Sequence, residues 1–108
     1  MLTTVLTYLA EKRGVDLRRS RHDEVAKAIR RARGSTFLLL AEEQVPLAGR
    51  LTDVEVQATT EELATFFDAF KPASNGSEVG EAMREGIRFL RRALEAVDPG
   101  TVILLAIL

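Results

Sequence analysis

Apolar and polar positions alternate with a helical period near the end of the chain. Between Val79 and Val97 apolar residues recur every three or four positions, and arginine and glutamate fill the other side. This pattern is typical of an amphipathic helix that covers a core. Asn75 and Glu78 have the spacing of a capping box at the helix start. Gly80 and Gly86 cost helix stability, so they predict points where the helix closely approaches the sheet.

Two uninterrupted apolar runs predict strands. Thr36–Ala41 is one, and Thr101–Leu108 follows the helix-breaking Asp98-Pro99-Gly100. Both are apolar on both faces, as strands inside a covered sheet are. Leu51–Ala58 alternates apolar and polar residues, which predicts a half-exposed or edge strand. Its short connection to Thr36–Ala41 favours an antiparallel hairpin.

The remaining segments supply further elements. Thr59 and Glu62 form a second capping box, which predicts a helix with an apolar inner face. That face consists of Leu63, Phe66, Phe67 and Phe70. Ser20 caps another predicted helix, with Val25, Ala28, Ile29 and Ala32 inside. Residues 2–9 fit either a helix or a strand, because a helical stripe competes with strand-favouring threonine and valine.

The resulting order, (α or β)-α-β-β-α-α-β, predicts an α/β fold. We expect a small three-layer sandwich, with a mixed sheet of three or four strands and helices on both faces. A chain of 108 residues, 46% of them hydrophobic, is large enough for one core. Residues 1–108 are therefore expected to form a single α/β domain.

Composition narrows the possible chemistry. The sequence contains no cysteine, which excludes disulfides, a thiol nucleophile and cysteine-ligated metal sites. The N-terminus lacks a basic leader, and the terminal apolar run is far shorter than the roughly 20 residues of a membrane span. A cytoplasmic protein with no membrane partner is expected. No complete catalytic or cofactor motif is found, so no cofactor is expected and an enzyme is the less favoured reading.

Charge is unevenly distributed along the chain. Residues 1–40 carry nine basic and four acidic side chains, whereas residues 41–83 carry two and nine. Opposite halves commonly complement each other within a fold or between subunits, but the basic half could also bind nucleic acid. The candidate nucleic-acid-binding residues are Arg18, Arg19, Arg21, Lys27, Arg30 and Arg31.

Residues 76–83 carry a family resemblance. They read Gly-Ser-Glu-Val-Gly-Glu-Ala-Met, which resembles the G-[ST]-x-[IV]-G-x-A-[LM] turn of von Willebrand A domains. The likeness extends over roughly residues 35–108. If residues 1–9 form a strand, the element order also matches that family through its fourth strand. The resemblance implies a divalent-cation ligand at Ser77. The family's main metal loop, D-x-S-x-S, is absent, because Ala10–Gly14 stands in its place.

A shorter stretch is similar to another family. Asp23–Arg31 and the following Phe37–Glu43 resemble the helix and strand of kink-turn RNA-binding ribosomal proteins. Glu24 and Lys27 match positions that contact RNA in that family. Arg21 and Asp23 depart from its pattern. The alternative is that Glu24 and Lys27 are solvated helix residues.

Carboxylates after the first apolar run offer a third possibility. Ligands of α/β folds bind at the carboxyl ends of strands, where Glu42 and Glu43 lie. With Asp53 or Glu55 they could form a carboxylate cluster, and Gly76-Ser77 at a helix start could accept an anion. The candidate anion or metal ligands of a carboxylate- or metal-dependent enzyme are Glu42, Glu43, Asp53, Gly76 and Ser77. Adjacent glutamates at a strand end are more often solvated.

The final strand raises the question of what covers it. In the expected sheet it lies at an open edge, and a long apolar edge invites pairing with another chain. The sequence therefore favours a non-catalytic protein-interaction module, self-associating as a homodimer or joined to another protein. The candidate interface residues are Val102, Leu104, Leu105 and Ile107.

Overall fold

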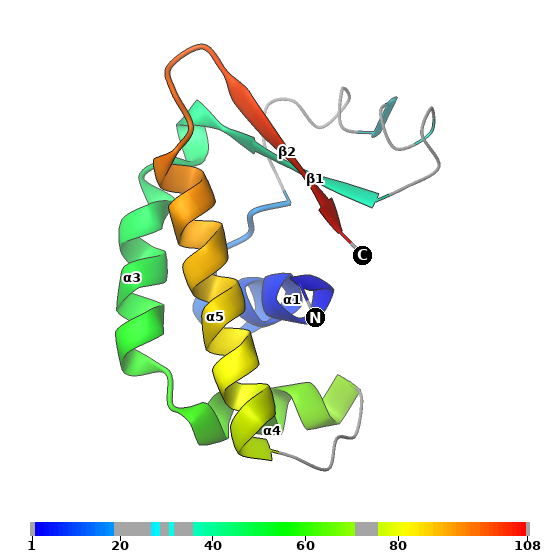
Figure 1. Ribbon diagram of the computed structural model, residues 1–108, viewed down its shortest axis with the longest axis vertical. Coiled ribbons are helices and arrows are strands. Elements are labelled where there is room, and N and C mark those ends of the chain that lie inside the picture. The colour runs from blue at the N-terminus through cyan, green and yellow to red at the C-terminus, as the bar shows by residue number, and fades with distance from the viewer. Residues whose placement is uncertain (1, 19–26, 29–30, 32–35, 71–75, 108) are drawn as a thin grey trace.

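The computed structural model describes residues 2–18, 27–28, 31, 36–70 and 76–107, and these residues are mostly helical. Figure 1 shows their arrangement. The elements are α1 (Leu2–Arg13), β1 (Thr36–Ala41), the 3₁₀ turn η1 (Glu42–Gln44), α3 (Leu47–Gln57), α4 (Thr60–Phe70), α5 (Gly76–Glu95) and β2 (Val102–Ile107).

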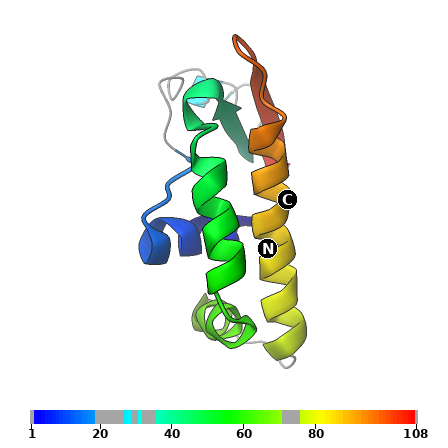
Figure 2. The same ribbon diagram turned by 90° about the vertical axis from the view of Figure 1, so that its left-hand side faces the viewer.

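Helix α5 is the axis of the molecule. Helix α3 runs alongside it, α4 packs across its N-terminal end, and the two strands lie beyond its C-terminal end (Figures 1 and 2). Helix α1 crosses behind α5 and completes the core. The α5 residues that face this core are fully buried, and they are Met83, Ile87, Leu90 and Leu94. The predicted amphipathic helix is therefore confirmed, and so is its end before Asp98-Pro99-Gly100.

Gly80 and Gly86 of α5 mark close approaches, but to helices rather than to the sheet. A Cβ at Gly80 would overlap the backbone carbonyl of Thr60 at the start of α4. A Cβ at Gly86 would come within 2.9 Å of the Val5 side chain in α1. The absence of a side chain at these positions lets the helices pack closely against α5.

Residues 2–9, left open between helix and strand, and the segment after Thr59, predicted as a helix, are both helical. Residues 2–13 form α1, whose Val5, Leu6 and Leu9 are buried, so the helical alternative holds for residues 2–9. Helix α4 begins where the capping box predicts it, because the backbone N–H of Glu62 donates to Thr59 Oγ1 at 3.0 Å. Leu63 and Phe66 of its predicted inner face are buried.

The strand predicted for Leu51–Ala58 is wrong, because this segment forms most of helix α3. Its alternating pattern also fits a helical spacing, in which Ala48, Leu51, Val54 and Ala58 face the core. Val56, which the alternating pattern would put with Val54 on one face, is 80% exposed. Without this strand the predicted hairpin does not form.

The three-layer sandwich is also wrong. Among the described residues the sheet has two strands, β1 and β2, paired antiparallel with Leu39 opposite Leu104. Helices α1 and α3 occupy segments that the von Willebrand A resemblance would make strands. Periodicity places both apolar runs in strands correctly, but it does not determine how many strands cover them. Instead, the helices form most of the core.

A buried glutamine joins the sheet to the segment after α1. Gln44 is 3% exposed, and its Oε1 accepts from the backbone N–H of Ala41 at 2.9 Å. Its Nε2 donates to the carbonyl of Leu17 at 2.9 Å. Because both ends of the amide are paired, the turn after β1 is fixed without an unsatisfied polar atom.

Some predictions fall partly or wholly outside the described residues. Of the helix predicted after Ser20, only Lys27, Ala28 and Arg31 are described, and all three are exposed. Ala28 was expected on the inner face. Asn75, the predicted cap of α5, also lies outside. Within the described parts of the chain, no helix is long and apolar enough to cross a bilayer.

Candidate interaction surface

Side chains of β2 alternate between the core and solvent. Ile103 and Leu105 are partly buried and pack against the core. Val102 and Leu104 point the other way and are 45% and 44% exposed. We call these two side chains, with the backbone edge of β2 that faces away from β1, the β2 surface.

The outer face of the sheet is covered unequally. On β1, Ala41 is buried, and it pairs with the half-exposed Val102. Leu39 is also buried and pairs with Leu104. On this face the β1 side chains Leu39 and Ala41 are therefore buried, whereas Val102 and Leu104 of β2 remain in contact with water.

The edge of β2 carries no feature that prevents pairing. Protective edges in natural proteins use lysine, proline, bulges or inward-pointing charges. The strand Val102–Ile107 contains no charged residue, proline or glycine. Its only strand partner among the described residues is β1. In the described part of the chain, no second strand pairs with the other edge of β2.

Of the four residues predicted to form the interface, Val102 and Leu104 lie on the β2 surface. Leu105 packs on the core instead, because side chains of a strand alternate between its two faces. Ile107 ends β2, and its side chain lies outside the described residues. The candidate interface is thus narrowed to Val102 and Leu104 on one face of β2.

The predicted basic set is not brought together as a described surface. Arg18 donates from its guanidinium to Thr7 Oγ1 at 2.8 Å and to the carbonyl of Thr3 at 3.2 Å, which fastens the segment after α1 back onto that helix. Lys27 and Arg31 are exposed. Arg19, Arg21 and Arg30 lie outside the described residues.

The predicted anion or metal set is split between opposite ends of the molecule. Gly76 and Ser77 begin α5, a helix of 20 residues, which spans about 30 Å. Glu42 lies beyond the other end, where its Oε2 accepts from the backbone N–H of Gly100 at 3.0 Å. Glu43 follows in η1, and Asp53 is exposed on α3. In the part of the chain that the structure describes, no three acidic, histidine or cysteine residues are grouped to hold a metal ion.

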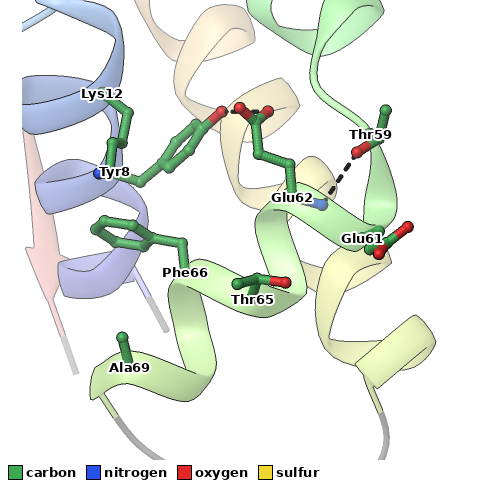
Figure 3. Close-up of a pocket in the computed structure, with 8 residues that line it drawn as sticks. All are labelled: Tyr8, Lys12, Thr59, Glu61, Glu62, Thr65, Phe66 and Ala69. Carbon is green, nitrogen blue, oxygen red and sulfur yellow. Dashed lines mark hydrogen bonds between the residues drawn. The ribbon is translucent and has the colours of Figure 1, made fainter.

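A hollow of about 580 Å³ lies between α1 and α4, and the sequence did not predict it (Figure 3). Tyr8 and Phe66 form its apolar wall, with their rings edge to face at a centroid distance of 5.2 Å. The lining residues are Tyr8, Lys12, Thr59, Glu61, Glu62, Thr65, Phe66 and Ala69. Tyr8 and Glu62 are 54 positions apart, so no sequence pattern signals their contact.

The polar groups behind this hollow are paired with one another. The Tyr8 hydroxyl donates to Glu62 Oε2 at 2.9 Å and accepts from Arg13 Nε at 3.0 Å, and Arg13 Nη2 reaches the same carboxylate oxygen at 2.8 Å. Burial raises the pKa of Tyr8, and Glu62 adds to this rise while Arg13 opposes it. Among the described residues no buried side-chain nitrogen or oxygen lacks a partner. This network therefore joins α1 to α4 without presenting a buried polar group to a ligand.

A second polar cluster joins α3 to α5. The carboxylate of Glu55 accepts from Arg88 Nε at 2.6 Å and from Arg91 Nε at 3.2 Å. Arg84 donates to the backbone carbonyls of Glu55 and Ala58 at the end of α3. Burial alone raises the pKa of Glu55, but the two arginines outweigh it and hold the pKa below its usual value. Such a paired carboxylate is suited to holding helices together rather than to proton transfer.

Comparison of the chain with protein-family models, curated proteins and solved structures finds no match.

Proposed function

We propose that this chain is a non-catalytic protein-interaction module that self-associates through the β2 surface, as a homodimer or as a subunit of a larger assembly. The observation that carries the proposal is the apolar, half-exposed pair Val102 and Leu104 on a strand without edge protection. Contact with another polypeptide would remove this area from water and pair the free backbone edge.

Self-association is the simplest form of such contact. When a strand pairs with its own copy, a charged side chain near the symmetry axis meets the same charge. β2 carries no charge at any position, so this repulsion does not arise. A two-stranded sheet is also marginal by itself, whereas four strands are common. Joining two copies would bring the sheet to that size.

The polar clusters support a catalytic or nucleic-acid-binding function less well than the β2 surface supports self-association. Glu55 is neutralised by two arginines, and the Tyr8 hydroxyl is held by Arg13 and Glu62. Arg18, one of the predicted nucleic-acid-binding residues, hydrogen-bonds within the fold to Thr3 and Thr7. We therefore assign the function to the β2 surface rather than to these groups.

A pair of lysine variants tests the proposal. Leu104→Lys places a charge on the β2 surface, and because Leu104 is half exposed, the fold should tolerate it. Val56→Lys adds the same charge at an exposed apolar position on α3, away from the sheet. We expect Leu104→Lys to be monomeric by light scattering coupled to size exclusion, while Val56→Lys keeps the mass of the wild type. An unchanged oligomer in folded Leu104→Lys would refute the proposal.

A further inference from the structure

If the β2 surface joins two copies, its side-chain pattern also restricts how the two strands pair. This step rests on the proposed function. We propose that β2 pairs antiparallel with β2 of a second copy, with the two-fold axis at Leu104. In this register Leu104 lies opposite Leu104 of the partner subunit, and Val102 lies opposite Ala106 of the partner subunit. The two sheets then form one sheet of four strands in the order β1-β2-β2-β1.

Symmetry determines the direction of pairing. A closed dimer of identical chains has a two-fold axis, so each subunit presents the same patch to the other. For two edge strands that continue one sheet, this axis is perpendicular to the sheet and makes the strands antiparallel. The outer face of one copy is then continuous with the outer face of the other. The core face, with Ile103 and Leu105, is likewise continuous.

The side-chain alternation restricts the register. Residues directly opposite each other in an antiparallel pair point to the same face. A register with Leu104 opposite Leu105 would match an outward residue with a core-facing one, so it is excluded. The axis must therefore pass through a residue. For the six-residue strand Val102–Ile107, an axis at Leu104 or at Leu105 gives the most paired positions.

Exposure selects between these two registers. With the axis at Leu104, Val102 and Leu104 both lie within the paired length, and Leu104 meets its own exposed copy. With the axis at Leu105, Val102 would lie opposite position 108, beyond the end of β2. That register would leave Val102, which is as exposed as Leu104, beyond the joined strands. The register centred on Leu104 covers more of the exposed apolar area.

The absence of native cysteine makes single-cysteine cross-linking a direct test. A disulfide needs Cα atoms about 4.4–6.8 Å apart. Among positions whose side chains lie on the same face of the sheet, only those directly opposite each other satisfy this distance. We expect Leu104→Cys to be converted to covalent dimer by mild oxidation. Val102→Cys alone should stay monomeric on a denaturing gel, because its copies are offset by four positions. Val102→Cys mixed with Ala106→Cys should give the mixed covalent dimer.

The outcomes separate the register from the proposed function. The solution mass of each variant is first measured under reducing conditions, to establish that the variant still associates. Efficient self-linking of Leu105→Cys, or no linking of Leu104→Cys and of the mixed pair in variants that remain dimeric, would overturn the register but leave self-association in place. A wild-type chain that is monomeric would overturn both. Should Leu104→Cys alone fail to associate, the mixed pair decides the register.

Discussion

Leu39 and Leu104 lie opposite each other in the antiparallel pair, yet Leu39 is 6% exposed and Leu104 is 44% exposed. Two leucines at paired positions on one face would have similar exposure if the face were evenly covered. Complete burial of a leucine side chain contributes about 1.5–3 kcal/mol relative to full exposure. Covering the exposed part of Leu104 with another chain would therefore contribute a further favourable free energy of burial.

Two glycine-to-alanine variants should change stability in opposite directions. Gly80→Ala would drive a methyl group into the carbonyl of Thr60, so we expect a loss of about 1–3 kcal/mol in the free energy of unfolding. Gly49 lies in α3 with nothing within 4 Å of its missing Cβ. Gly49→Ala should add up to about 1 kcal/mol through helix propensity.

Urea unfolding of the two variants checks this packing. The contrast between them matters more than either value, because both exchange the same atoms within a helix. If Gly80→Ala were as stable as Gly49→Ala, α4 and α5 would not approach as closely as the structure shows.

The phenol of Tyr8 should titrate above its usual pKa of about 10. It is the only tyrosine of a chain without tryptophan, so ultraviolet absorbance reports its ionisation directly. The raised pKa means that the fold favours the neutral phenol. The stability that the neutral Tyr8 phenol contributes is fully present below its pKa in the unfolded chain. It is lost as the pH rises through the higher pKa in the folded protein. Ionisation at the usual pKa in the folded protein would contradict the buried pairing with Glu62.

Removing the same hydroxyl should weaken the joint between α1 and α4. Tyr8→Phe leaves Arg13 Nε without its acceptor and takes a donor from Glu62. We expect a loss of about 1 kcal/mol in thermal or urea unfolding, with no change in solution mass. Thr7→Ala removes another α1 hydroxyl, which donates to the Thr3 carbonyl and accepts from Arg18, and is a control for the loss of side-chain hydrogen bonds outside the joint with α4.

Acid should weaken the α3–α5 contact through Glu55. Its pKa is lowered because Arg88 and Arg91 outweigh the effect of burial, so its contribution to stability is present above the usual pKa of 4.5 and is lost as the pH falls through the folded value. Glu55→Gln should cost about 1–3 kcal/mol at neutral pH, and less in acid. Glu85→Gln, which removes an exposed partner of Arg88, should cost far less. A Glu55→Gln deficit independent of pH would contradict this account.

Strong local patterns predicted several elements of the fold. The apolar run Thr36–Ala41 is β1 with the same bounds, and the α4 cap at Thr59 lies where the sequence places it. Helix α3 was missed because Val54 and Val56 also fit a two-residue period, and only burial separates them. The number of strands in a sheet depends on long-range packing, which periodicity does not contain.

The sequence predicted the candidate surface only in outline. The sequence identified the terminal strand as unprotected, and Val102 and Leu104 are indeed exposed. It could not assign Leu105 to the core, because a run that is apolar at every position does not show which side faces inward. Contacts such as Tyr8 with Glu62 join distant parts of the chain and leave no local signal.

The central claim, self-association through an apolar surface, is tested most directly by the solution mass of the wild-type chain at low and high salt. An interface built on Val102 and Leu104 contains no ion pair, so salt should not weaken it. The account predicts twice the chain mass, or a higher multiple, under both conditions. A monomer at both salt concentrations, or a dimer that dissociates in high salt, would contradict it.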